Sequence, residues 1–201
     1  MKTSNAWLTL VVLLAVHGSA RSDFIATATL TGAADDITTT GFGQGTVIYN
    51  AAAETLSVTL TFNDLTSPTA IPTGVPGAAH IHFGTPTPPG GPIIFPFVEP
   101  YANNFPLGVT SGTYTTTLTS ASLLSDPANG INTFAEAVNA IEEGHTYFNV
   151  HTLKYPGGEI AGQITTVISA VVPEPASLAL LTLGLGGILA IARFRRRRLT
   201  A

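Results

Sequence analysis

Alternation of apolar and polar residues along Glu54 to Phe62 is the feature that most limits the fold. Positions 56, 58, 60 and 62 are leucine, valine, leucine and phenylalanine, and serine or threonine stands between them. Successive side chains of a β-strand point to opposite faces, so this stretch predicts a strand with one buried and one solvated face. Gly43 to Tyr49 is a second expected strand, and Asn50 to Ala53 predicts the hairpin turn between the two.

Strands also dominate the rest of the body. We expect them at Phe24–Leu30, Ala79–Gly84, Ile93–Val98 (an edge strand), Gly112–Thr119, Tyr147–Thr152 and Glu159–Ile168. One short helix is expected where apolar residues recur at helical spacing from Phe134 to Ile141, with Asn132 or Thr133 as N-cap and Gly144 as terminator. Short strands separated by turn residues predict an all-β fold, a two-layer β-sandwich.

The charge of the body excludes polyanionic ligands. The whole chain has a formal net charge of -4, but six of its eight basic residues lie in the two end segments. Between Ser22 and Val172 there are eleven acidic residues and one basic residue, Lys154, a net charge of -10. Such a domain repels nucleic acid and anionic lipid. The chain has no cysteine, so packing alone must stabilise it.

Residues 1–20 have the pattern of a secretory signal peptide. Lys2 precedes the apolar run Ala6–Val16, and the segment closes on the small residues Gly18, Ser19 and Ala20. The run is too short and wrongly flanked for a permanent membrane span. The alternative is a buried N-terminal helix. We expect signal peptidase to remove this segment.

The C-terminal end predicts a transmembrane helix followed by a stop signal. Ala176–Ala192 is uncharged, and as a helix its 17 residues cover roughly 25 Å, the short end of what crosses a bilayer. The stop signal consists of Arg193, Arg195, Arg196, Arg197 and Arg198. Arginines stay on the cytoplasmic side, so the body must lie outside the inner membrane.

Three residues in front of this span, Pro173, Glu174 and Pro175, complete a known pattern. The order of this motif, a short apolar span and terminal arginines resembles the PEP-CTERM sorting tail of Gram-negative bacteria. The resemblance implies that residues 171–201 are a sorting tail recognised by an exosortase, a membrane-embedded sorting protease. The alternative is an ordinary C-terminal anchor.

Two motifs in the body resemble the CHRD domain, a module of exported proteins. The first is His80–Gly84 followed by Gly91–Ile94, and the second is Tyr147–Thr152 followed by Pro156–Ile164. The resemblance covers about Phe24 to Ile168, and we place the domain at 21–170. The family usually has arginine where this chain has Ala161. The resemblance implies an extracellular all-β module without an established biochemical activity.

Strand parity places His80 and His82 on one face, and His151 on the corresponding face of another strand. If the two strands are neighbours, the three imidazoles and the carboxylate of Glu159 could converge away from the core. Three imidazoles are a ligand set for zinc or copper. The alternative is that these histidines hydrogen-bond loop carbonyls, for example to brace the proline-rich loop Thr85–Pro92.

The first functional hypothesis is therefore an exported, non-enzymatic surface or matrix protein without a cofactor, sorted by exosortase, with exopolysaccharide or surface proteins as partners. The rival is a single-metal module, or an oxidoreductase shaped like the Greek-key sandwich of copper-zinc superoxide dismutase. The mature chain has four histidines, too few for that enzyme's bridged two-metal site. It has no cysteine for that enzyme's disulfide. No serine-hydrolase elbow, phosphate-binding loop or zinc-protease motif occurs.

Overall fold

The computed structural model describes residues 22–70, 77–87, 90–102, 104–169 and 184. Its nine strands are β1 (Phe24–Thr31), β2 (Phe42–Asn50), β3 (Thr55–Asn63), β4 (Ala79–Phe83), β5 (Ile93–Pro96), β6 (Gly112–Leu118), β7 (Thr146–Val150), β8 (Ile160–Gln163) and β9 (Thr165–Ser169). The helix α1 spans Phe134–Glu142, and three short 3-10 helices lie at Gly32–Asp35, Ser120–Ser122 and Pro127–Asn129. The all-β prediction with one short α-helix is confirmed for this part of the chain.

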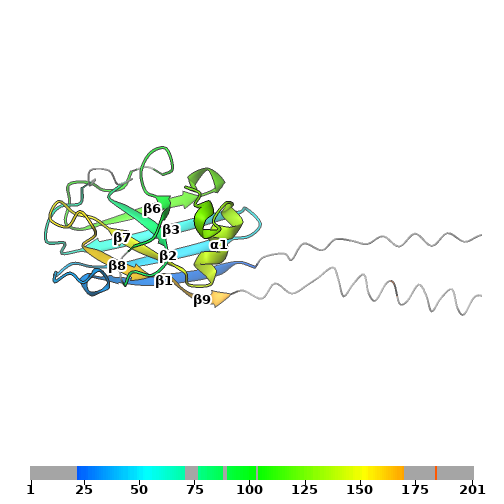
Figure 1. The fold of residues 1–201 in the computed structure, drawn as a ribbon, viewed down its shortest axis with the longest axis horizontal. Helices are drawn as coiled ribbons and strands as arrows, with labels where there is room; N and C mark the ends of the chain where they lie inside the picture. Colours follow the sequence, from blue (N-terminus) through cyan, green and yellow to red (C-terminus); the bar gives the residue numbers. More distant parts are fainter. Residues whose placement is uncertain (1–21, 71–76, 88–89, 103, 170–183, 185–201) are drawn as a thin grey trace, which may run out of the picture.

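All strand pairs are antiparallel and belong to one sheet (Figure 1). Its strand order is β5-β4-β7-β8-β1-β2-β3-β6, and β9 pairs with β1 beside this path. The sequence predicted a two-layer sandwich, whereas the structure joins all strands through the β8–β1 pair. That link is short, because the single register pair between these strands is Ala161 with Thr31.

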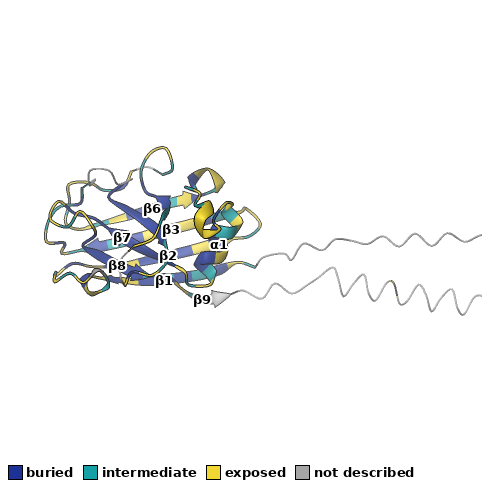
Figure 2. Cartoon of the chain, viewed as in Figure 1, coloured by how far each residue is buried: buried dark blue, intermediate teal, exposed yellow. Residues whose placement is uncertain are grey.

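The two halves of the sheet face each other across the hydrophobic core. A side chain at Gly45 of β2 would collide with the ring of Phe148 of β7, so a glycine here lets the two halves approach closely. The apolar face predicted for β3 is confirmed, because its four side chains are each at most 1% exposed: Leu56, Val58, Leu60 and Phe62. Figure 2 shows this division, with buried positions alternating with exposed ones along the strands. Each such side chain contributes roughly 1.5–3 kcal/mol through burial.

The helix α1 begins and ends where the sequence predicted. Thr133 is its N-cap and forms a capping box with Glu136, which satisfies backbone N–H groups of the first turn. Gly144 follows the helix with a φ of 75°, a conformation that glycine adopts without strain. The buried face of α1 includes Val138 and Ile141, and the helix contacts β1 and β9.

The single strand predicted at Glu159–Ile168 is wrong. The structure divides it into β8 and β9 at Ile164, because the chain changes partner there from β7 to β1. Ile164 is fully buried, and its N–H donates to the carbonyl of Thr146 at 2.9 Å. The break therefore keeps a large side chain in the core while the pairing changes.

The predicted signal peptide and sorting tail lie outside the described residues, with the exception of Gly184. Among the helices that the structure describes, none is long and apolar enough to cross a membrane. The start of β1 pairs with the end of β9, Phe24 with Ser169, so the described body begins and ends at the same end of the domain. The loop after β7 lies at the opposite end (Figure 1).

Candidate metal centre

Strands β4 and β7 bring the three predicted histidines together. In the antiparallel register, His80 lies opposite Asn149 and His82 lies opposite Tyr147. His151 directly follows β7, and its N–H donates to the carbonyl of Ala78 at 2.8 Å, which continues the pairing by one step. His80 and His151 are therefore diagonal neighbours on one face of the sheet, a separation that ring side chains can bridge.

The three rings converge on one point. One ring nitrogen of each of His80, His82 and His151 lies within 4.8 Å of the other two. The Nε2 atoms of His80 and His151 are 2.9 Å apart. The ring centroid of His80 is 4.6 Å from that of His82 and 4.6 Å from that of His151. The predicted convergence of the imidazoles is confirmed, and whether they bind a metal stays a prediction.

Loop carbonyls fix the orientation of two of the rings. Nδ1 of His82 lies 2.9 Å from the carbonyl oxygen of Gly91, and Nδ1 of His151 lies 2.9 Å from that of Pro156. A carbonyl only accepts hydrogen bonds, so each Nδ1 carries the proton and each Nε2 presents a lone pair. The expected bracing of the proline-rich loop is confirmed for His82. A hydrogen bond from Nδ1 to a backbone carbonyl is also the arrangement that orients metal-binding histidines in proteins.

This face of the sheet is buried, although strand parity predicted that it points away from the core. His80 is 0%, His151 3% and His82 9% exposed. The loops around Gly90–Gly91 and Pro156–Gly157 fold over the rings. Burial lowers the pKa of His82, against the opposing effect of its backbone hydrogen bond. Burial likewise lowers the pKa of His151 to about 4, so both imidazoles are neutral at pH 7, the protonation state that binds metals.

Tyr147 and Asn149 complete the site, and the sequence analysis did not assign either of them to it. The Tyr147 ring stacks on His82 with centroids 4.7 Å apart, and its hydroxyl donates to the carbonyl of Gly90 at 2.9 Å. Asn149 is 2% exposed, and its Oδ1 has no hydrogen-bond partner among the described residues. The sequence signal for them is their alternation with His151: residues 147, 149 and 151 point to the same side of the extended chain.

A cavity of about 390 Å³ lies beside the three rings. The residues that line it are His80, His82, Gly90, Gly91, Ile93, Tyr147, Asn149, His151, Pro156 and Gly157. All three histidines and Asn149, whose amide oxygen is buried without a partner among the described residues, therefore line one space. A metal ion held by the histidines would be accessible to a further ligand from this side.

Glu159 does not join the histidines, so its predicted convergence with them is wrong. Its carboxylate accepts hydrogen bonds from the Thr39 hydroxyl at 2.5 Å, the Thr66 N–H at 2.6 Å and the Thr152 hydroxyl at 2.8 Å. Burial alone would raise the pKa of Glu159, but these three hydrogen bonds outweigh it and hold the pKa below its usual value. The ionised carboxylate ties three loops together.

The remaining histidine of the predicted mature chain, His145, lies outside the cluster. Its side chain is 60% exposed and stands 3.4 Å from the carboxylate of Glu143. It therefore serves as a natural reference for the buried histidines.

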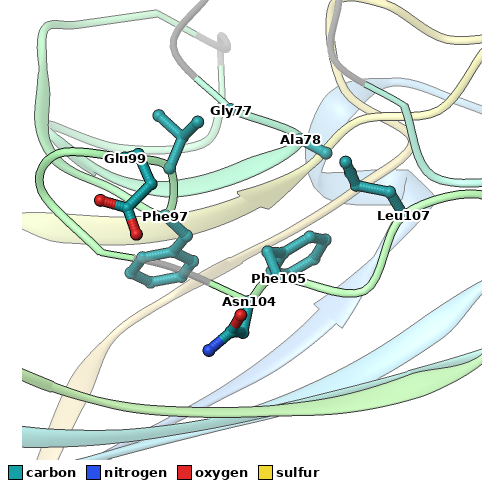
Figure 3. A pocket seen from close by; sticks show the side chains of 8 residues that line it. Gly77, Ala78, Phe97, Glu99, Asn104, Phe105 and Leu107 are labelled. Atoms are coloured by element: carbon teal, nitrogen blue, oxygen red, sulfur yellow. The ribbon is translucent and has the colours of Figure 1, made fainter.

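A second hollow, of about 150 Å³, was not indicated by any sequence motif. Figure 3 shows it between the segments around Ala78, Phe97 and Phe105, with Glu99 and Asn104 as its polar side chains. Among the described residues that line it, Glu99 is the one ionisable group. The histidine cavity is therefore the stronger candidate for chemistry.

The fold and the site define an all-β domain with buried histidines gathered at one strand pair. Comparison with protein families matches residues 26–164 to the CHRD domain and residues 171–198 to the PEP-CTERM protein-sorting motif. The chain belongs to the CHRD domain family and carries a PEP-CTERM sorting motif at its C-terminal end. No curated protein and no solved structure gave a significant match. The motif implies export, processing by an exosortase and sorting to the cell surface.

Proposed function

We propose that this protein is a non-enzymatic surface or extracellular-matrix protein of a Gram-negative bacterium. The observation that carries the proposal is the order of two family matches in one chain, a CHRD domain at 26–164 followed by a sorting motif at 171–198. The domain is the part that is displayed, and the motif is the signal that directs its sorting.

The proposed path begins with removal of residues 1–20 by signal peptidase. The span 176–192 then holds the precursor in the inner membrane, with Arg195–Arg198 on the cytoplasmic side. Exosortase recognises Pro173–Pro175 and separates the domain from the span. A protease added to spheroplasts should therefore digest the body and leave the arginine tail protected. Protection of the body would contradict this topology.

Two features of the described residues support a displayed, structural domain. The buried carboxylate of Glu159 accepts three hydrogen bonds from loop residues, which supports a structural role for it. The histidine cavity lies near the loop after β7, at the opposite end of the domain from the end of β9, where the tail begins (Figure 1). A domain tethered through its tail thus presents this cavity outward, toward matrix polysaccharide or other surface proteins.

Surface labelling tests the proposal. Intact cells expressing the protein are labelled with an antibody against the folded domain, and a Glu174→Ala variant is compared with a Ser177→Ala control in the apolar segment. We expect Glu174→Ala to lose most of the surface label while the total amount of protein is unchanged. Equal labelling of both variants would contradict sorting through the motif.

A second candidate function is a single-metal module, and the convergence of His80, His82 and His151 favours it. Its catalytic form is an oxidoreductase of superoxide-dismutase-like, Greek-key shape, which stays a prediction of the sequence. The test is superoxide dismutation by the copper-loaded protein. If the wild type has this activity and His80→Ala lacks it, the non-enzymatic proposal is wrong. Metal binding without turnover would leave that proposal intact and add a ligand to it.

A further inference from the structure

One of the residues that line the histidine cavity has a buried polar atom without a hydrogen-bond partner among the described residues. Asn149 is 2% exposed, its Nδ2 donates to the carbonyl of Gly157 at 3.3 Å, and its Oδ1 has no partner among the described residues. Buried amide oxygens nearly always accept a hydrogen bond, so an orphan of this kind points to a group that is bound there. The same cavity is bordered by the three histidines.

We propose that His80, His82 and His151 bind one zinc or copper ion, and that its fourth coordination position opens toward Oδ1 of Asn149 and takes a ligand that donates a hydrogen bond. The inference rests on the metal-binding candidate function and specifies the ligand of that site. Water, a hydroxyl group or an amine has the hydrogen that Oδ1 requires, and a bare anion does not.

The spacing of the rings suits such an ion. Nitrogens bound to a tetrahedral ion at ~2.0–2.1 Å stand about 3.3 Å apart. The Nε2 atoms of His80 and His151 are 2.9 Å apart, and all three ring nitrogens lie within 4.8 Å of one another. The His80–His151 separation must therefore open by about 0.4 Å, and the widest separation in the cluster must close by at most about 1.5 Å, for the three nitrogens to hold one ion.

The hydrogen bonds around the rings favour the same result. The carbonyls of Gly91 and Pro156 hold the Nδ1 protons of His82 and His151, so both Nε2 atoms carry lone pairs, and Nε2 of His151 lies 2.9 Å from Nε2 of His80. Nε2 of His151 then accepts the proton that lies between it and His80. An incoming ion takes the place of that proton, which leaves for solvent or moves to the other ring nitrogen of His80.

Three imidazoles fill three of the four positions that zinc prefers, which is the arrangement of metal sites that keep one exchangeable ligand. Among the described residues no carboxylate joins the three histidines, and Glu159 is bound to Thr39, Thr66 and Thr152. The cavity of about 390 Å³ has room for a ligand larger than water. A hydroxyl of a polysaccharide has the required donor hydrogen, which fits the proposed location of the domain.

The first arm of the test measures the metal alone. The full-length chain is purified in detergent without a histidine tag and titrated with zinc and separately with copper(II) by calorimetry. We expect one ion per chain, a loss of at least 100-fold in affinity in His80→Ala, and no change in the control His145→Ala, whose residue is exposed and outside the cluster. If His80→Ala does not fold, His82→Gln replaces it. Failure of wild-type protein to bind either ion overturns the metal-binding candidate itself.

The second arm measures the fourth position with azide, a ligand that binds copper(II) and has no hydrogen to donate. Azide should change the visible spectrum of the copper-loaded wild type in a saturable way. Asn149→Ala should keep its copper and bind azide more tightly, on the order of fivefold, because the displaced water no longer has a hydrogen bond to Oδ1. A spectrum that azide leaves unchanged refutes the open position, and equal azide affinity in both proteins refutes the role of Asn149, while metal binding stands in either case.

Discussion

Removal of the Glu159 side chain should be one of the most destabilising single changes in the domain. The carboxylate is 0% exposed and holds Thr39, Thr66 and Thr152, which lie on three different loops. Hydrogen bonds to a charged group contribute about 1.5–3 kcal/mol each, and removal of one partner of a buried charged network costs about 3–5 kcal/mol. We therefore expect Glu159→Ala to lower the free energy of unfolding by about 4 kcal/mol.

Urea denaturation at pH 7 measures this change. With a slope of about 2 kcal/mol per molar urea, the midpoint of Glu159→Ala should fall by about 2 M. The matched control is Glu143→Ala, whose side chain is 64% exposed and should change the free energy by less than about 0.5 kcal/mol. A Glu159→Ala midpoint within 0.5 M of the control, by the same estimate, would refute the argument that this carboxylate ties the loops.

The pH dependence gives an independent check with Glu159→Gln. The pKa of Glu159 is lowered in the folded state from an ordinary value of 4.5. The unfolded chain therefore takes up the proton first as the pH falls, so the charge stabilises the fold fully above pH 4.5 and loses its effect as the pH drops through the lower folded pKa. The stability difference between wild type and Glu159→Gln should shrink below pH 4.5. A constant difference down to the acid unfolding transition would contradict this assignment.

Two further changes test the packing of the fold. Gly45→Ala should cost about 1–3 kcal/mol in urea denaturation, because the added methyl group collides with the Phe148 ring; a neutral effect would mean that the two halves of the sheet pack less closely. Thr133→Ala should cost about 1 kcal/mol, because the capping box with Glu136 is lost. Its thermal midpoint should fall by a few degrees, and an unchanged midpoint would show that α1 does not depend on its cap.

The sequence predicted the strands and the helix of this fold well, because the formation of each element depends mainly on residues that are close together in the sequence. Alternation along Thr55–Asn63 and the Thr133 cap are properties of short segments, and both are confirmed. Parity also placed His80, His82 and His151 on corresponding faces. The pairing of their strands had to be assumed, and the structure supplies it.

Contacts between distant segments could not be predicted in this way. Glu159 bonds Thr39, 120 residues away in the sequence, and Thr66, 93 residues away. Parity shows that a side chain leaves the core face, but it does not show that a loop folds over it, as Gly91 does over His82. The break at Ile164 has the same origin, since it depends on which strand pairs with each half of the segment.

The intact mass of the protein recovered from the cell surface or the medium tests the central claim most directly. If the chain is a CHRD-domain protein delivered by its sorting motif, the mass should correspond to a body that lacks residues 1–20, the apolar span 176–192 and the terminal arginines. A peptide map gives the same test. Peptides of the body that contain Glu136 and Glu159 should be recovered, and peptides that contain Arg195–Arg198 should be missing. A surface protein whose mass still includes Arg195–Arg198 would contradict exosortase processing and leave the tail as a plain anchor.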